Sequence, residues 1–271
     1  MTTGNESLIR AWLPPAVRRW GNRMLRTLIT YRGPFVDWAA AKAATSGYQH
    51  EEILARVRLA IQSVLRGEAD YEQDGVAFRG SPPASYALSA LLLAACRNNG
   101  HLSVLDFGGG LASSYLRWRP LFGALSGLHW AVVEQSHFVA EGNELYAGDP
   151  SVSFHEDLAQ VSPRPNVVLA SSVLQYLADP YEVLHRLASL RADVIVLDRT
   201  PCGVEDSVYA QFVPARLGKA SYPLWVLSRD KVHSALSRNY TLLSEFDSLD
   251  EPLVVHGATA RYCGSIWLHR A

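Results

Sequence analysis

The segment Ser103-Val-Leu-Asp-Phe-Gly-Gly-Gly-Leu-Ala112 joins a short apolar run to a turn made of three glycines. The apolar run predicts a β-strand over residues 102–107, and the residues after the glycines predict the start of a helix. Glycines in a strand-to-helix turn let the backbone approach a ligand closely, because they carry no Cβ. We therefore expect a small molecule to bind across this turn.

From residue 102 onward, short β-rich runs alternate with helical stretches. We predict strands over 102–107, 130–134, 152–155, 167–170 and 194–197, and helices near 112–122, 136–147 and 180–190. This alternation predicts a doubly wound, mostly parallel α/β sheet with right-handed crossovers. After the fifth strand we expect a long functional loop over 201–228, a helix near 229–238, and strands near 240–246 and 261–268, which completes seven strands.

The first eighty residues have a different pattern, which predicts a helical region. Apolar residues at three- and four-residue steps predict two helical pieces over 7–30 and helices over 35–45 and 51–66. Turn-forming residues follow over 71–83, and an Ala/Leu-rich helix is expected over 84–97. We therefore expect an N-terminal helical cap, residues 1–80, and a ligand-binding domain, residues 81–271.

The composition indicates a globular protein without a strong charge. The 271 residues include 25 Lys and Arg against 26 Asp and Glu, so the formal net charge is −1 and no basic field exists to attract nucleic acid. The cysteines, Cys96, Cys202 and Cys263, are far apart and form no CxxC pair, which argues for a reducing compartment and against a disulfide framework. We expect a cytoplasmic protein that binds no nucleic acid.

Signals for targeting, membranes and metals are also missing from the sequence pattern. The arginines of the first thirty residues are scattered among apolar positions, without the apolar core of a signal peptide. No apolar run reaches the roughly 18 residues of a membrane-spanning helix, and the histidines have no ligand spacing such as HExxH. We expect no membrane partner and no metal, and the oligomeric state stays open.

Two carboxylates follow successive predicted strands and point to an adenosine. Glu134 ends the second strand, where a carboxylate can accept both ribose hydroxyls, and Asp157 follows the third strand, at the height of an adenine amino group. The dinucleotide fingerprint would need glycine at position 113, where Ser113 stands, which disfavours NAD.

This combination resembles the class I S-adenosylmethionine (SAM) dependent methyltransferases over residues 84–271. The resemblance implies their fold, SAM as cosubstrate, and a binding set in which Asp106, Gly108 and Gly110 flank the methionine end, Glu134 binds ribose, and Asp157 with Leu158 holds adenine; Gly109, Ala112, Gln135 and Ser171 complete that set. The third small position of the turn is commonly glycine in this family. Here it is Ala112, whose methyl group either changes how the SAM tail is held or simply starts a helix.

A narrower resemblance covers nearly the whole chain. It rests on Gly47-Tyr48, Tyr71-Glu-Gln-Asp74, Leu105-Asp-Phe-Gly-Gly-Gly-Leu111, Ser171-Ser-Val-Leu-Gln-Tyr-Leu177, Leu197-Asp-Arg-Thr-Pro201 and Tyr222-Pro-Leu-Trp225. These segments look like a bacterial methyltransferase-like family associated with polysaccharide or natural-product pathways, in or near which we place the azetidine-2-carboxylate synthases. That resemblance implies cyclisation of SAM, in which its own amine attacks the γ-carbon and methylthioadenosine leaves.

Candidate catalytic residues follow the fourth and fifth strands. Tyr176 is the first candidate, because an aromatic face excludes water and stabilises a sulfonium by about 0.5–2 kcal/mol. Ser172 and Gln175, with Ser171, are placed to bind the SAM amine or carboxylate, with helix capping as the alternative. Arg199 is placed to hold a carboxylate, with a structural ion pair as the alternative. Further aromatic or lid candidates are Tyr48, Tyr71, Trp225, Tyr209, Gln211 and Tyr222.

Three functions remain open at this point. Cyclisation of SAM is slightly favoured, because no acceptor-side base stands out, a cap can seal the pocket, and Ala112 departs from the usual turn. Methyl transfer to a small-molecule or sugar acceptor is the alternative. An inactive SAM-fold protein that binds a partner through its arginine-rich N-terminus is the third possibility.

Overall fold

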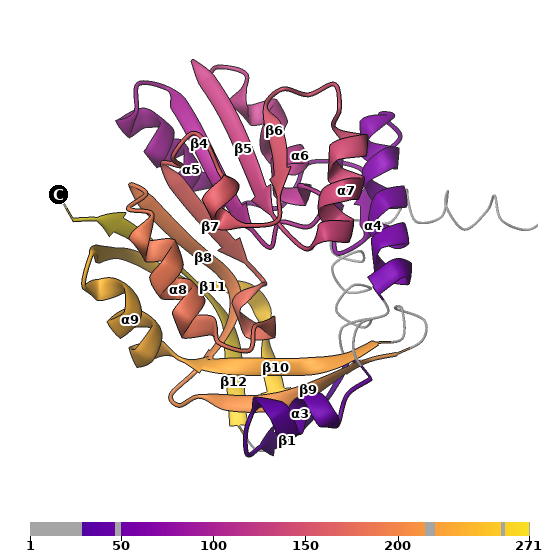
Figure 1. Cartoon of the computed structure of the whole chain (residues 1–271), viewed down its shortest axis with the longest axis vertical. Helices are drawn as coiled ribbons and strands as arrows, with labels where there is room; N and C mark the ends of the chain where they lie inside the picture. The colour runs from indigo at the N-terminus through magenta and orange to yellow at the C-terminus, as the bar shows by residue number, and fades with distance from the viewer. Residues whose placement is uncertain (1–28, 47–49, 215–219, 256–257, 271) are drawn as a thin grey trace, which may run out of the picture.

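The computed structural model describes residues 29–46, 50–214, 220–255 and 258–270 (Figure 1). Over these residues the main sheet has ten strands, of which seven lie in the order β6-β5-β4-β7-β8-β12-β11. Their bounds are β4 His101–Phe107, β5 Gly127–Val133, β6 Val152–His155, β7 Val167–Ser171, β8 Val194–Gly203, β11 Tyr240–Val255 and β12 Ala258–His269. Strands β4 to β8 are parallel, and β12 is antiparallel to both β8 and β11. The predicted doubly wound, mostly parallel sheet is therefore confirmed.

The direction of winding reverses between β4 and β7, which are neighbours in the sheet. From β4 the chain proceeds outward through β5 to β6, and from β7 it proceeds the other way to β8. Ligands of open α/β sheets bind beyond the carboxyl ends of the strands at such a reversal. The glycine-rich turn leaves the end of β4 and therefore lies at this position.

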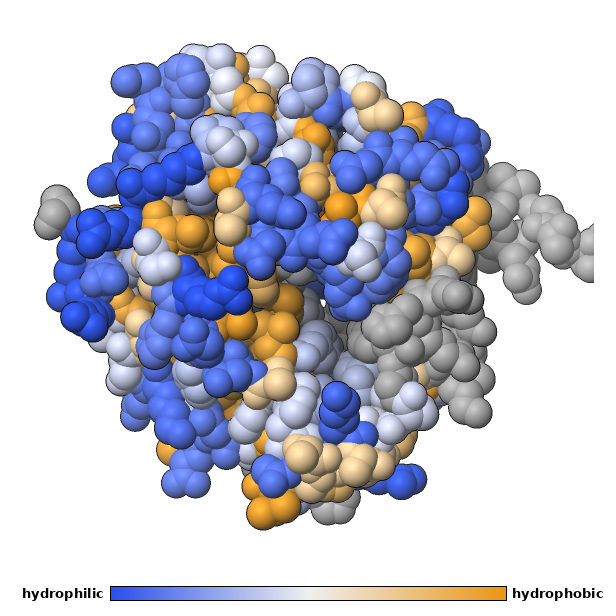
Figure 2. All heavy atoms as spheres, in the orientation of Figure 1, coloured by the Kyte–Doolittle hydropathy of each residue, from blue (hydrophilic) through white to orange (hydrophobic). Residues whose placement is uncertain are grey.

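Helices cover both faces of the sheet. On one face lie α4 His50–Leu65, α5 Tyr86–Arg97, α6 Ser113–Trp118 and α7 Ser136–Leu145; on the other lie α8 Pro180–Ser189 and α9 Arg229–Ser237. Strand β4 serves both cores, because Leu102 and Val104 pack on the first face and Leu105 on the second. Helix α4 runs beside α7 (Figure 1), where Arg58 Nε lies 2.8 Å from Glu141 Oε1. Hydrophilic residues cover most of the face in Figure 2, with hydrophobic ones between them.

The prediction of a long loop over 201–228 is wrong. Strand β8 continues to Gly203, and β9 Ser207–Val213 and β10 Ala220–Ser228 form an antiparallel pair. Strand β10 pairs with β8 only at Leu227 and Ser228, opposite Cys202 and Gly203. Its Pro223 pairs with β9 on one side only, so the missing N–H of proline breaks no second ladder. The half-open edge of β10 therefore permits a strand that contains a proline.

The described part of the N-terminal cap is not purely helical, which corrects the sequence prediction. Strand β1 Thr30–Phe35 pairs antiparallel with β9, α3 spans Trp38–Ala43, and a hairpin is formed by β2 Tyr71–Gln73 and β3 Val76–Phe78. Helix α4 agrees with the prediction over 51–66. The two helical pieces predicted over 7–30 lie outside the described residues, apart from residues 29 and 30. The candidate Tyr48 also lies outside them. The boundary between residues 80 and 81 stays a prediction.

Across the described ranges, no helix combines the length and the apolar character that a membrane crossing needs.

Candidate functional site

Two glycines with positive φ shape the turn at the end of β4. Gly108 has φ +72° and Gly110 has φ +58°. A Cβ on Gly108 would lie 2.4 Å from Cγ2 of Val173, in the turn after β7, whereas a Cβ on Gly110 would meet no atom within 4 Å. Gly108 is thus packed against the neighbouring strand end, and Gly110 faces open space from which a ligand can reach the backbone.

Ala112 continues the turn in the same left-handed conformation, with φ +59°, and is the N-cap residue of α6. A residue other than glycine costs about 1–2 kcal/mol in that conformation. Ala112 is fully buried in the core beneath α5, α6 and α7. Its methyl group therefore packs inside the protein, which removes the departure at position 112 as an argument for cyclisation.

Asp106 is the buried carboxylate beneath the turn. It is 2% exposed, and Trp130 Nε1 donates a hydrogen bond of 3.1 Å to its Oδ2. A Cβ on Gly109 would lie 2.5 Å from the carboxyl carbon of Asp106, so the backbone passes this carboxylate only as glycine. Burial and the negative charge of Glu134 together raise the pKa of Asp106 to about 7, against the opposing effect of the Trp130 hydrogen bond.

This raised pKa predicts a pH dependence of stability that Asp106→Asn removes. Between the pKa of an unfolded aspartate, about 3.9, and about 7, the folded state holds the proton that the unfolded state has lost. Asp106 therefore stabilises the fold at acidic pH, and this contribution is lost as pH rises toward 7, at up to about 1.4 kcal/mol per pH unit. Urea unfolding of both proteins from pH 4 to 7 tests this. An unfolding free-energy difference between wild type and variant that does not change with pH would contradict it.

Glu134 stands at the end of the adjacent strand β5, as predicted. Its backbone N–H donates to the carbonyl of His155 in β6 at 3.0 Å, and its Oε2 accepts from the N–H of Gln135 at 2.8 Å. The side chain of Glu134 is partly buried, whereas Gln135 is exposed and begins α7 as its N-cap without a side-chain hydrogen bond. The carboxylate is thus oriented by the backbone at the carboxyl edge of the sheet.

Asp157 follows β6 at the next strand end and is exposed. Its Oδ1 accepts from the N–H of Ala159 at 2.9 Å and caps a short 3₁₀ turn that begins at Leu158. Arg186 Nη2 lies 3.8 Å away from the same oxygen. Leu158 is partly buried against the core beneath α8. The structure therefore gives Asp157 a capping role beside the position predicted for adenine.

Two residues are left-handed at this edge: Ser172, with φ +57°, directly follows β7, and Arg199, with φ +50°, lies within β8 just after its pairing with β7 ends at Asp198. Gln175 is fully buried, and its Nε2 donates to Ser172 Oγ at 3.1 Å and to the Arg199 carbonyl at 3.3 Å. Ser171 Oγ donates to Asp198 Oδ2 at 3.5 Å, and the N–H of Arg199 donates to Asp198 Oδ1 at 2.9 Å. In this structure Gln175 joins the turn after β7 to strand β8. The catalytic roles predicted for these residues stay predictions.

Contacts that we did not predict from the sequence fix the hairpin β2–β3 over the carboxyl edge of the parallel strands. Asp74 accepts from Arg199 Nη1 at 3.2 and 3.4 Å. Glu72 is 2% exposed and accepts from the N–H of Gly75 at 2.6 Å, while Arg117 Nη2 of α6 donates to the Glu72 carbonyl at 3.0 Å. The only sequence signal for these contacts was the segment Tyr71–Asp74 of the narrower resemblance, which we interpreted as a turn.

The two arginines under the hairpin influence one another. Burial lowers the pKa of Arg117, and the positive charge of Arg199 lowers it further. The Asp74 carboxylate raises the pKa of Arg199. Burial raises the pKa of Glu72. Two guanidinium groups in a water-poor position can bind a carboxylate strongly.

Tyr176 stands over this region in contact with the β9–β10 pair. Its ring meets the ring of Tyr222 edge to face, with centroids 5.1 Å apart and planes at 87°. Gln211, opposite Tyr222 in the ladder, donates to the Tyr222 hydroxyl at 3.0 Å. Tyr176, Tyr222 and Gln211 are therefore brought together from η3 (Leu174–Tyr176), β10 and β9.

The other aromatic candidates are in structural contacts. Trp225 stacks on Trp38 at 5.9 Å, and its Nε1 donates to the Leu177 carbonyl at 3.1 Å. Tyr71 stacks on Phe78 at 5.1 Å within the hairpin, and Tyr209 is buried in a small core formed by β9, β10 and β12.

Comparison with known proteins gives structural neighbours only. No family model and no curated protein matches the chain. A SAM-dependent methyltransferase from Clostridium acetobutylicum is similar over 69% of this chain and 93% of its own, at 10% identity and a TM-score of 0.45. The magnesium protoporphyrin IX methyltransferase of Synechocystis, with bound SAM, is similar over 83% of this chain and 99% of its own, at 14% sequence identity and a TM-score of 0.44. The 1,6-didemethyltoxoflavin-N1-methyltransferase of Burkholderia thailandensis is similar over 83% of this chain and 92% of its own, at 13% sequence identity and a TM-score of 0.43.

Proposed function

We propose that this chain is a SAM-dependent enzyme that transfers the methyl group of SAM to a small-molecule acceptor. The observation that best supports SAM use is the arrangement of side chains at successive strand ends. Asp106 lies near the end of β4, the glycine turn follows β4, Glu134 follows β5 and Asp157 follows β6, all at one edge of the sheet. A carboxylate beside a glycine turn at a reversal of winding suits an adenosine ribose.

The methionine part of SAM would lie between the glycine turn and Arg199, which lies within β8. In this proposal Gly110 admits the ligand to the backbone, since it faces open space. Arg117 and Arg199 attract the methionine carboxylate, and Ser171 and Ser172 bind its amine. The hairpin over this position would exclude water, which strengthens each of these polar interactions.

The acceptor would lie beside Tyr176, on the side of the β9–β10 pair. Tyr222 and Gln211 add an aromatic and an amide group to this side. The sulfonium needs no acid at the leaving side, because a neutral thioether departs, so the site has to align the acceptor with the methyl group. The formal charge of −1 and the covering hairpin favour a small acceptor over a nucleic acid.

Cyclisation of SAM to azetidine-2-carboxylate is the second candidate, and the pair Arg117 and Arg199 favours it. Cyclisation requires a neutral SAM amine, whose ordinary pKa is about 7.7–8. Two nearby guanidinium groups and burial would lower the pKa of that amine, so it could act as nucleophile without a dedicated base.

Mass spectrometry of the purified chain with SAM separates the two reactions. Methyl transfer predicts that SAM alone is stable and that S-adenosylhomocysteine forms only with an acceptor, searched among hydroxyl-, amine- and carboxyl-bearing small molecules. Formation of methylthioadenosine and azetidine-2-carboxylate from SAM alone would replace this proposal by cyclisation.

Two variants test the role of Tyr176 in the same assay. We expect Tyr176→Phe to keep most of the activity and Tyr176→Ala to lose it. Absence of any thermal stabilisation by SAM would overturn both reactions.

A further inference from the structure

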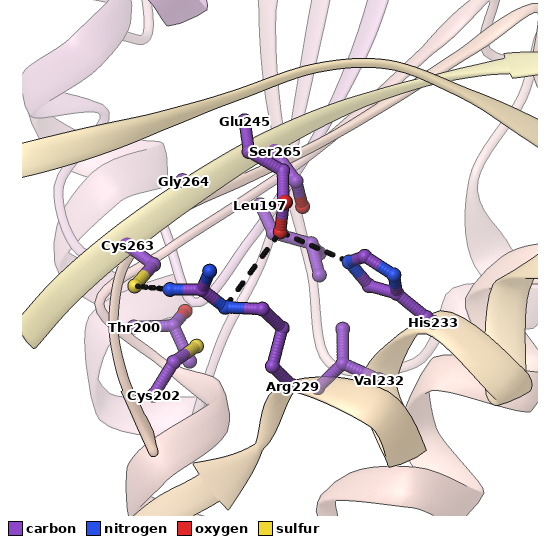
Figure 3. A pocket seen from close by; sticks show the side chains of 10 residues that line it. All are labelled: Leu197, Thr200, Cys202, Arg229, Val232, His233, Glu245, Cys263, Gly264 and Ser265. Carbon is purple, nitrogen blue, oxygen red and sulfur yellow. Dashed lines mark hydrogen bonds and ion pairs between the residues drawn. The ribbon is translucent and has the colours of Figure 1, made fainter. Parts of the chain in front are cut away.

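A second cluster of reactive side chains lies away from the proposed SAM site, between α9 and strands β8, β11 and β12. It lines a cavity of about 20 Å³, enough for a water-sized molecule (Figure 3). The cavity is lined by Leu197, Thr200, Cys202, Arg229, Val232, His233, Glu245, Cys263, Gly264 and Ser265. None of these residues has a role in the function proposed above.

The antiparallel pairing of β8 with β12 brings two cysteines together. Cys202 lies opposite Arg261 and Cys263 lies opposite Thr200, so the two cysteines are diagonal neighbours on one side of the ladder. Each thiol influences the other: the neighbouring Cys263 raises the pKa of Cys202, and the neighbouring Cys202 lowers that of Cys263, whose Sγ also lies 3.5 Å from the Arg261 carbonyl oxygen. Both thiols are free, and Cys263 is 8% exposed.

A cation is held against the sulfur of Cys263. Arg229 Nη2 donates to Cys263 Sγ at 3.5 Å, and Arg229 Nε lies 3.9 Å from Glu245 Oε1 (Figure 3). His233, one turn later in α9, contacts the same Glu245 oxygen at 2.9 Å. Arg229 stabilises the thiolate of Cys263, and Asp247 opposes this from β11. A thiolate beside a guanidinium and a second thiol is the arrangement of a redox-reactive cysteine pair.

We propose that Cys263 is a site of oxidation by hydrogen peroxide and that Cys202 resolves the product to a disulfide. The Cys263 thiolate attacks one peroxide oxygen; the S–O bond forms, the O–O bond breaks, and hydroxide leaves and takes up a proton as water. Cys202 loses its proton and attacks the sulfenic sulfur; the S–S bond forms, and the sulfenic oxygen leaves with that proton as a second water. Two thiols and one peroxide thus give one disulfide and two waters.

The experiment treats the reduced full chain with hydrogen peroxide, blocks remaining thiols with iodoacetamide and identifies the products by mass spectrometry. We expect a loss of about 2 Da, one hydrogen from each thiol, in a cross-link between the peptides that contain Cys202 and Cys263. The exposed Cys96 is the internal reference and should react more slowly. Modification of Cys263 no faster than of Cys96, without the cross-link, would overturn the proposal.

Three variants test the separate roles. Cys202→Ser should stop the reaction at a sulfenic acid on Cys263 that dimedone traps, and Cys263→Ser should form neither product. Arg229→Gln should slow alkylation of Cys263 at pH 7 by about five- to tenfold, because the thiolate loses its cation. Arg261→Gln is the matched control, since its guanidinium pairs with Asp247 at 3.1 Å and leaves the Arg229 contact in place. Equal rates in the two arginine variants would contradict the role of Arg229.

Discussion

Replacing Glu134 by alanine is expected to abolish the thermal stabilisation of the protein by SAM and S-adenosylhomocysteine. A carboxylate that accepts two ribose hydroxyls makes two charge-assisted hydrogen bonds, each of about 1.5–3 kcal/mol. Their loss weakens binding by about 100-fold or more. Titration calorimetry with S-adenosylhomocysteine measures this loss for either reaction proposed above, because both use the same adenosine site.

Glu156→Ala is the matched control for this variant. Glu156 stands at the end of the next strand and is exposed. Its removal changes the charge by the same amount and should leave the affinity within about twofold, since exposed charges act weakly over distance. Unchanged binding in Glu134→Ala, or equal losses in both variants, would contradict the placement of ribose at Glu134.

The second large effect is expected on stability, from Gly108→Ala. The new Cβ would occupy a left-handed conformation, which costs about 1–2 kcal/mol, and would lie 2.4 Å from Cγ2 of Val173. Overpacking of this kind costs about 1–3 kcal/mol more. We therefore expect a decrease of about 2–5 kcal/mol in the free energy of unfolding, measured by urea denaturation.

Gly110→Ala and Val173→Ala separate the two contributions. Gly110 has a similar φ of +58°, but a Cβ added there would meet no atom within 4 Å, so Gly110→Ala should carry only the conformational cost. The double variant Gly108→Ala/Val173→Ala removes the Cγ2 atom but keeps the Val173 Cβ at 2.7 Å, and should recover part of the loss. If Gly108→Ala and Gly110→Ala lower the free energy of unfolding by the same amount, the packing of the turn against the end of β7 is not as described.

Local sequence patterns predict those features that depend on a single segment of the chain, such as a strand, a helix or a turn. The β-rich runs and helical stretches after residue 102 identified the parallel strands and their helices to within a few residues, except that β8 continues six residues beyond the predicted end at 197, because period and turn residues act locally. The positions of the glycine turn, Glu134 and Asp157 at successive strand ends followed from the same pattern. The same reasoning failed for the loop predicted over 201–228, where β9 and β10 form instead, since only the pairing of β10 reveals that a strand with Pro223 is possible at this half-open edge.

Contacts between distant segments could not be derived in this way. Asp74 and Arg199, which pair across the candidate site, are 125 residues apart, and nothing in either segment specifies the other. The bridge from Gln175 to Arg199 depends on two left-handed residues, one directly after β7 and one within β8. The thiol pair Cys202 and Cys263 depends on the register of β8 against β12.

The class of sheet, the direction of its parallel strands and the edge that carries the glycine turn can therefore be predicted from the amino-acid sequence, because periodicity, turn residues and right-handed crossovers are local or general rules. Three features depend on the packing of distant segments: which side chains meet over that edge, the extension of the sheet by β9 and β10, and the cavity shared by two distant cysteines. Register and burial decide these contacts, and both are properties of the whole packed chain.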